Sequence, residues 1–161
     1  MARSHSYQTT VRWTGNTGAG TRAYRSYSRD HVIAFDGKEP IAGSSDPAFR
    51  GDPARTNPED LLIGSLAACH MLWFLHLASQ AGLVVESYVD PAEAEMEMNP
   101  DGSGQFTRAV LRPEVVISKG DKNLSAELHE QAHERCFIAR SVNFPVLCEP
   151  TISREVSTQP G

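Results

Sequence analysis

The sequence predicts an α+β domain in which a mostly antiparallel sheet wraps around one long, buried central helix with a second helix beside it. Residues 57–82 are apolar in nearly every direction around a helix axis, which is typical of a helix buried on all sides. The segments before and after it alternate apolar and polar residues between turn clusters, as strands in hairpins do. A chain of 161 residues suits one domain, which we expect to span 1–161 without an internal linker.

The first third of the chain predicts an antiparallel meander. The dipeptide Asp36-Gly37 is typical of a two-residue hairpin turn. Residues 43–56 contain two prolines and two glycines without periodicity, so we expect a loop long enough to have a function. This loop delivers Arg50 and Arg55 just before the central helix. The expected extended pieces of the meander are 7–13, 24–27, 31–35 and 38–41.

The central helix has clear start and stop signals. Asn57 is a capping residue, Pro58 suits the first helical position, and Glu59 suits the positive end of the helix dipole. Gly82 supplies the stop. The helix should therefore run between Asn57 and Gly82.

A membrane span is the alternative for this stretch, because it approaches the roughly 20 apolar residues that a bilayer requires. His70 and His76 would then lie in hydrocarbon, where polar groups are costly, and no flanking cluster of basic anchors accompanies them. We therefore expect no membrane partner. One sheet and one short helix cannot cover so apolar a helix, which predicts a second subunit, most economically in a homodimer.

The last half of the chain predicts a second hairpin, a helix and a closing strand. Residues 83–98 and 106–117 alternate as two strands, with Pro113 marking an edge or a bulge. Asp121 or Asn123 can cap a helix that runs to about Ala139. Its apolar face includes Cys136, which should therefore point inward. A closing strand follows over 141–153, interrupted by two prolines.

Composition excludes several classes of partner and location. The net charge of −5 is mild and the basic residues are scattered, so a nucleic-acid surface has no support. The N-terminus has no apolar run, which favours a cytoplasmic protein without a signal peptide. Three cysteines are an odd number without a secretory signal, so we expect reduced thiols, of which at least one could be chemical.

Cys69 is the thiol with the most unusual setting, about a dozen residues into the central helix, where the terminal dipole has faded. Glu59 lies ten positions earlier (69 − 59), about 15 Å along a straight helix, and His70 points about 100° away. A reactive Cys69 therefore needs a cation from outside the helix. A long arginine held by a carboxylate could approach the sulfur, and the candidates are Arg50, Arg22 and Arg55, in that order.

The run Asn57-Pro58-Glu59, the alanines before Cys69 and a second cysteine at Cys136 near the end of another helix together resemble the OsmC/Ohr family of thiol peroxidases. The resemblance covers nearly the whole chain. It implies that Cys69 attacks an organic hydroperoxide, or hydrogen peroxide, and becomes a sulfenic acid. It also implies that Cys136 resolves this acid to a disulfide, which an external dithiol reduces.

The resemblance further implies an arginine paired with Glu59, an intertwined homodimer, no cofactor, and a role in oxidative or osmotic stress defence. The arginine has no clean match, and Arg50 is the first choice. His70 stands where an aromatic or aliphatic residue is expected, and residues 137–140 replace the usual proline-containing turn. Cys148 has no counterpart and is interpreted as structural. If Met71, Leu72 and Phe74 line the pocket together with residues of a second subunit, bulky apolar hydroperoxides are favoured.

Two other functions are compatible with the residues. His129, His133 and Cys136 recur at i, i+4 and i+7 on one helical face, which is compatible with zinc, and Cys69 or His70 could be a fourth ligand. The third possibility is a catalytically silent binding module that keeps the fold. Loss and recovery of free thiols with peroxide and dithiol would distinguish the peroxidase from a metalloprotein.

Overall fold

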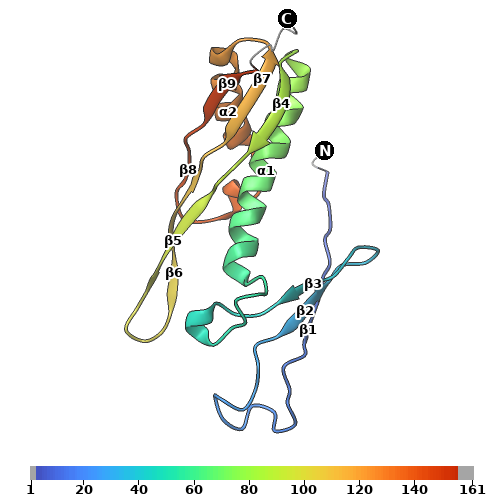
Figure 1. Cartoon of the computed structure of the whole chain (residues 1–161), viewed down its shortest axis with the longest axis vertical. Helices are drawn as coiled ribbons and strands as arrows, with labels where there is room; N and C mark the ends of the chain where they lie inside the picture. The colour runs from blue at the N-terminus through green and yellow to red at the C-terminus, as the bar shows by residue number, and fades with distance from the viewer. Residues whose placement is uncertain (1–2, 156–161) are drawn as a thin grey trace, which may run out of the picture. The chain divides into compact units, whose positions relative to one another are not determined.

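The structure is a computed structural model that describes residues 3–155 (Figure 1). The chain divides into two compact units, Met1–Leu62 and Ile63–Gly161. Helix α1 (Pro58–Gln80) starts in the first unit and continues into the second. Within the described range the strands form three sheets of three strands each, one in the first unit and two in the second. The α+β class expected from the sequence is confirmed.

The first unit contains an antiparallel sheet of order β1-β2-β3, with bounds β1 Thr10–Trp13, β2 His31–Ala34 and β3 Ile41–Gly43. The meander is therefore confirmed. Asp36 and Gly37 do turn the chain, but residues 35–40 connect β2 to β3, so the turn is not a two-residue hairpin, and the third strand lies at Ile41–Gly43 rather than at 38–41. The strand expected over 24–27 is wrong, because this segment folds into turns. The Arg29 guanidinium lies 4.3 Å from the Tyr24 ring and 4.2 Å from the Tyr27 ring, and donates to both backbone carbonyls. These contacts hold the segment curled rather than extended.

The loop before α1 contains a 3-10 turn, η1 (Pro47–Phe49), capped by the Asp46 carboxylate, which accepts from the Ala48 N–H at 2.7 Å. Arg50 follows in the left-handed region with φ 67°, a conformation that non-glycine residues rarely adopt. Arg55 forms ion pairs with Asp30 and Asp52 at 3.8 and 3.5 Å. The loop is thus ordered by local side-chain contacts.

The two ends of α1 lie where the sequence places them. The Asn57 side chain accepts from the Asp60 N–H at 2.8 Å, and the Asp60 carboxylate accepts from the Asn57 N–H at 3.2 Å, a reciprocal capping box. At the other end Gly82 adopts φ 71°, and the Leu83 N–H donates to the Ala78 carbonyl at 3.0 Å. This left-handed glycine closes the helix as a Schellman motif does.

Burial of α1 on all sides is not found in this chain. One face is buried, through Leu66, His70, Phe74, Leu77 and Ala78. The opposite face, through Gly64, Ala68, Leu72 and His76, is exposed, and Leu72 is 63% exposed. By length and composition alone α1 could cross a membrane, with a mean hydropathy of 1.7 and 28% of its most apolar window buried. Its apolar surface therefore extends beyond what the chain itself covers.

The two long strands expected after α1 are each broken in the middle, giving β4 Val84–Val89, β5 Glu93–Met98, β6 Gly104–Leu111 and β7 Glu114–Lys119. The breaks fall at Pro91 and Pro113, which cannot donate to a ladder. They lie together, since the Asp90 carboxylate accepts from the Arg112 N–H at 2.7 Å. The hairpin therefore contributes to two sheets, through β4–β7 and β5–β6.

The closing segment also divides in two at Pro150, giving β8 Val146–Cys148 and β9 Thr151–Arg154. Both strands run parallel to their neighbours, β8 to β6 and β9 to β7. The remaining pairings are antiparallel, so the sheets are mostly antiparallel, as expected, with a parallel third strand in each sheet of the second unit.

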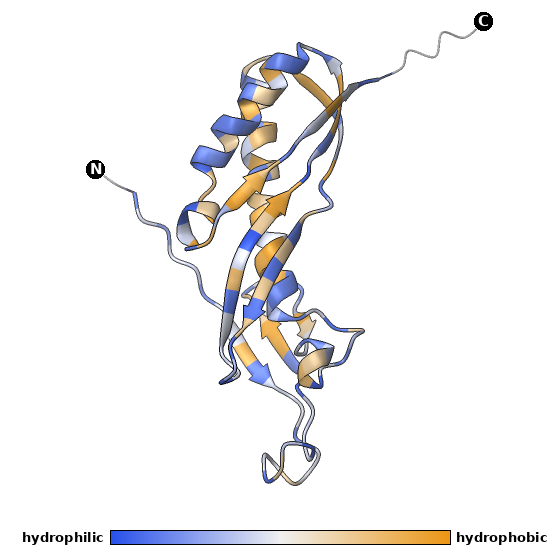
Figure 2. Ribbon diagram, turned by 90° about the vertical axis from the view of Figure 1, so that its left-hand side faces the viewer, coloured by the Kyte–Doolittle hydropathy of each residue, from blue (hydrophilic) through white to orange (hydrophobic). Residues whose placement is uncertain are grey.

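Helix α2 (Lys122–Arg135) begins at its Asp121 cap, as expected, but ends earlier than Ala139. Cys136 is the extended C-cap residue, and a 3-10 turn, η2 (Ala139–Ser141), follows. In Figure 2 the ribbon of α2 is coloured mostly hydrophilic, and only Ser125, Leu128, His129 and Ala132 of this helix are buried.

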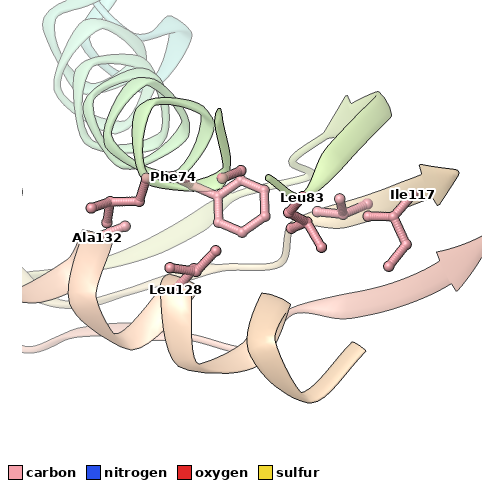
Figure 3. Packing of buried hydrophobic residues seen from close by; sticks show 8 residues of the cluster. Phe74, Leu83, Ile117, Leu128 and Ala132 are labelled. Carbon is pink, nitrogen blue, oxygen red and sulfur yellow. The ribbon is translucent and has the colours of Figure 1, made fainter. Parts of the chain in front are cut away.

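The core of the second unit joins both helices to the sheet. Figure 3 shows Phe74 of α1 facing Leu128 and Ala132 of α2, with Leu83 and Ile117 beside them. All five side chains are buried. Because this cluster fixes α1 against α2, it also positions the cysteines and histidines that these helices carry.

Candidate functional site

A pair of thiols is the first candidate site in the second unit. Cys69 lies in α1 and is half-buried, whereas Cys136 at the end of α2 is 1% exposed. Cys69 lies near enough to Cys136 to help raise the pKa of the Cys136 thiol, and both thiols are free rather than joined in a disulfide. The two cysteines singled out by the sequence therefore lie side by side, with Cys136 pointing inward as expected.

Local structure explains why Cys136 reaches α1. Because α2 stops at Cys136, the chain turns there, and Ile138 and Ala139 pack against the cluster that contains Leu66 of α1. The Phe137 ring lies edge-on to Trp73 of α1, with ring centroids 5.5 Å apart. Residues 137–140, which differ from the expected proline-containing turn, thus hold the second thiol against the first helix.

The environment of Cys136 favours its protonated form. Burial raises the pKa of the Cys136 thiol to about 11, and the neighbouring Cys69 adds to this effect. The Ala139 N–H, which donates to the Cys136 sulfur at 3.4 Å, acts in the opposite direction. At neutral pH Cys136 is therefore a protonated thiol beside Cys69.

The remaining residues expected at this site do not meet Cys69 within its unit. Glu59 lies in the first turn of α1, and because α1 is one continuous helix, it is about 15 Å along the axis from Cys69. Arg22, Arg50 and Arg55 belong to the first unit, whereas Cys69 belongs to the second. The pairing of an arginine with Glu59 and Cys69 stays a prediction.

A second polar cluster lies deeper in the second unit, and it contains His129 and His70, which the sequence suggested as zinc ligands with other partners. His70 Nε2 lies 3.0 Å from His129 Nδ1 and 3.4 Å from the Cys148 sulfur. His70 is 0% exposed and His129 is 2% exposed. The His129 ring stacks on Phe74 with centroids 3.9 Å apart, which fixes its orientation. The sequence suggested His70 only as an alternative fourth ligand and interpreted Cys148 as structural, so it did not identify this cluster.

This arrangement revises the ligand set expected for a metal. Instead of His129, His133 and Cys136, the structure brings together His129, His70 and Cys148, whose ligand atoms all lie within 4.8 Å of one another. Cys136 instead faces Cys69. The signal available in the sequence was the position of His70, four residues from Leu66 and from Phe74 on the buried face of α1.

Burial also sets the protonation of this cluster. It lowers the pKa of His70 to about 4, with a further contribution from His133, and lowers that of His129 to about 3. Burial raises the pKa of Cys148 to about 12, and the carboxylates of Asp90 and Glu149 act in the same direction. At neutral pH the cluster is two neutral imidazoles beside a protonated thiol.

Comparison with known proteins relates the chain to one family. The family described as OsmC-like protein matches residues 51–150. An OsmC-like protein of unknown function from Vibrio cholerae is 34% identical, with a TM-score of 0.82 over 92% of this chain and 100% of that one.

Two more distant relatives cover a similar share of the chain. The organic hydroperoxide resistance protein OhrB of Bacillus subtilis has a TM-score of 0.61 at 20% identity, over 91% of this chain and 98% of its own. The uncharacterized protein YmaD of the same organism is 24% identical over 143 residues, which cover 86% of this chain and 87% of YmaD. At 20% identity, the likeness to OhrB shows that the two proteins share a fold.

Proposed function

Because this chain belongs to the OsmC-like protein family, we propose that it is a thiol-dependent peroxidase that reduces organic hydroperoxides. Among the proteins that share its fold, OhrB is an organic hydroperoxide resistance protein. The observation that carries the proposal is the proximity of the buried Cys136 thiol to Cys69. A role in oxidative or osmotic stress defence in the cytoplasm follows as part of the same proposal.

In the first step the Cys69 thiolate attacks the terminal oxygen of the hydroperoxide. A sulfur–oxygen bond forms, the oxygen–oxygen bond breaks, and the alkoxide leaves as an alcohol once it takes up a proton. Cys69 is oxidised to a sulfenic acid and the peroxide is reduced. A cation next to the sulfur would stabilise both the thiolate and the departing alkoxide, which is the role proposed for Arg50 with Glu59.

In the second step Cys136 attacks the sulfenic sulfur of Cys69. A disulfide forms, and the hydroxyl group leaves as water with the Cys136 proton. An external dithiol then reduces the disulfide by exchange and is itself oxidised. The raised pKa of Cys136 supports this division of roles, because the protonated thiol is a poor nucleophile toward peroxide and leaves that part to Cys69.

We also propose that the functional form is a homodimer. The exposed apolar strip of α1, through Gly64, Ala68 and Leu72, gives a second subunit a surface to cover. Homodimers are the commonest oligomers of soluble chains. A dimer also provides two copies of the loop that carries Arg50, and the arginine at each Cys69 can come from either chain.

The substrate proposal rests on α1 residues near Cys69. Leu72, Trp73 and His76 line a shallow pocket of about 260 Å³. Phe74, expected in this lining, lies in the core instead, where it is fully buried against His129. An apolar lining of this kind favours hydroperoxides with an apolar organic group over hydrogen peroxide.

The test is peroxide consumption with a small dithiol as reductant. We expect the wild type to turn over an organic hydroperoxide, and Cys69→Ser to consume it no faster than buffer does, because serine is not ionised at neutral pH. Ser79→Ala, at an exposed position of the same helix, is the matched control and should keep its rate. Full turnover by Cys69→Ser would contradict the proposal, as would a wild-type activity that a chelator abolishes.

A further inference from the structure

The cluster of His70, His129 and Cys148 lies outside the thiol pair and takes no part in the chemistry proposed above. It draws one residue from each of three elements, α1, α2 and β8, so the fold and not local sequence brings the residues together. His129 and Cys148 also line a pocket of about 560 Å³ in the second unit. The cluster is therefore buried but borders a cavity from which a small ion can enter.

The polar atoms around this cluster are poorly satisfied by the chain. Among the described residues, the buried side-chain polar atoms without a hydrogen-bond partner are those of His70, Tyr88, Asp90, Ser125, His129 and His133. Cys148 interacts electrostatically with Asp90 and Tyr88, and His70 interacts with His133. Several of the residues with unpaired atoms therefore lie near the cluster. Unsatisfied buried polar groups cost stability and call for an explanation. On the two histidines these atoms are His70 Nδ1 and His129 Nε2, the ring nitrogens opposite those that face each other, so an ion between the facing nitrogens would leave both as they are. The unpaired atoms therefore show only that this part of the core is polar.

We propose that His70 Nε2, His129 Nδ1 and the Cys148 sulfur form a binding site for a borderline-soft divalent metal ion, with zinc as the ion that fits best. Imidazole nitrogen with thiolate sulfur is a ligand set that zinc prefers. Three protein ligands leave a fourth position for water or an exogenous ligand, on the side where His129 and Cys148 border the pocket.

The spacing of the three atoms suits a tetrahedral ion. Zinc bonds of about 2.0–2.1 Å to nitrogen and about 2.3 Å to sulfur place neighbouring ligand atoms roughly 3.3–3.6 Å apart. The chain holds His70 Nε2 3.0 Å from His129 Nδ1 and 3.4 Å from the Cys148 sulfur. These two distances differ from the expected ones by a few tenths of an ångström, and all three ligand atoms lie within 4.8 Å of one another.

The proton balance is also favourable. Burial keeps both imidazoles neutral, so neither has to lose a proton before its free electron pair binds the ion. The Cys148 thiol gives up one proton to solvent as the sulfur–metal bond forms. The site then carries one net positive charge, which the nearby Asp90 carboxylate can balance. Metal binding should therefore release one proton and weaken as the pH falls.

The inference does not depend on the proposed peroxidase, because the two sites share no residue. Their tests are separate as well, since metal binding is read without peroxide. The decisive experiment is titration of the reduced, metal-free, full-length chain with zinc, and with cobalt(II) as a spectroscopic probe. We expect one ion per chain, a thiolate-to-cobalt charge-transfer band, and ligand-field bands of tetrahedral intensity.

Variants assign the band to the cluster. Cys148→Ser should remove the charge-transfer band and weaken zinc binding at least tenfold, and His129→Gln should weaken binding to a similar extent. Cys69→Ser should keep the band. Binding that survives unchanged in Cys148→Ser, a band lost in Cys69→Ser, or a wild type that takes up no ion would each overturn the proposal.

A measurement on the wild type covers the case in which Cys148→Ser does not fold. One equivalent of zinc should slow alkylation of Cys148 at least tenfold and leave the alkylation of Cys69 unchanged, as mapped by peptide mass spectrometry. Protection of Cys69 and Cys136 instead would show that the ion binds the redox pair and would contradict the proposed site.

Discussion

The Cys136 thiol lies next to Cys69, although Cys69 belongs to α1 and Cys136 is the residue at which α2 ends. Two features produce this proximity. Helix α2 ends at Cys136, and the turn that follows packs on the face of α1 around Leu66. A thiol next to a sulfenic acid traps it as a disulfide before further oxidation, which is the geometry that a reversible peroxidase requires.

Replacing Cys136 should separate the two steps of the cycle. In Cys136→Ser we expect the first reduction of peroxide to proceed at close to the wild-type rate, because Cys69 is intact. The sulfenic acid should then persist, be captured by a sulfenate-specific reagent, and give sulfinic acid with excess peroxide. Mass spectrometry of the treated protein measures the sulfenic acid, its adduct with the reagent and the sulfinic acid.

A bulky dithiol reduces the wild type by attacking the disulfide of Cys69 and Cys136, which Cys136→Ser cannot form. With such a dithiol, the steady-state turnover of Cys136→Ser should fall roughly tenfold or more. A variant that turns over normally and yields no trapped sulfenate would show that Cys136 is not the resolving residue.

The pH dependence of thiol labelling tests the environment of Cys136. Its pKa is raised to about 11, so the fraction of thiolate at a given pH below this value is smaller than for an ordinary thiol. Its alkylation rate should therefore keep rising with pH until about 11, well beyond the range in which a solvated thiol levels off. Peptide-resolved alkylation of the reduced protein measures this, with the unfolded chain in urea as control. A plateau near the ordinary thiol pKa of about 8.5 would contradict the assigned environment.

Phe74 should be a major contributor to stability. It is fully buried, packs against Leu128 and Ala132, and stacks on His129. Phe74→Ala should lower the free energy of unfolding by roughly 3–5 kcal/mol, measured by urea denaturation. Met71→Ala, on the same helix but only half-buried, is a matched truncation and should cost less. An equal loss for both variants would show that the core lies elsewhere.

Leu72 tests the proposed dimer, since its side chain is largely exposed within one chain. Leu72→Asp places a charge in the apolar strip of α1 and should weaken self-association at least tenfold, because an unpaired charge is costly to bury. Analytical ultracentrifugation over a range of concentrations measures this. Gln80→Asp, at an exposed position at the end of α1, is the control and should associate like the wild type. Identical behaviour of the two variants would place the interface away from this strip.

Local signals in the sequence account for much of the fold. Asn57 and Gly82 mark the ends of α1, and Asp121 marks the start of α2, because capping is decided by neighbouring residues. The double break at Pro91 and Pro113 is harder to predict. Each proline alone permits a bulge or an edge strand, and only their approach in space divides the hairpin between two sheets.

The candidate sites divide in the same way. A motif and its spacing identify Cys69 and Cys136, and the inward face of α2 is enough to orient Cys136. The cluster of His70, His129 and Cys148 depends on α1, α2 and β8 meeting in the core, and no periodicity within one element contains that information. The parallel pairing of β8 with β6, which places Cys148 beside His70, is equally non-local.

The most direct test of the central claim is to map the disulfide formed when the reduced protein reacts with one equivalent of an organic hydroperoxide. The account predicts loss of two thiols per chain and a peptide pair that joins Cys69 to Cys136, with Cys148 still free. Addition of a dithiol should restore all the thiols. A disulfide that includes Cys148, or oxidation of Cys69 to a sulfinic acid with Cys136 untouched, would contradict it.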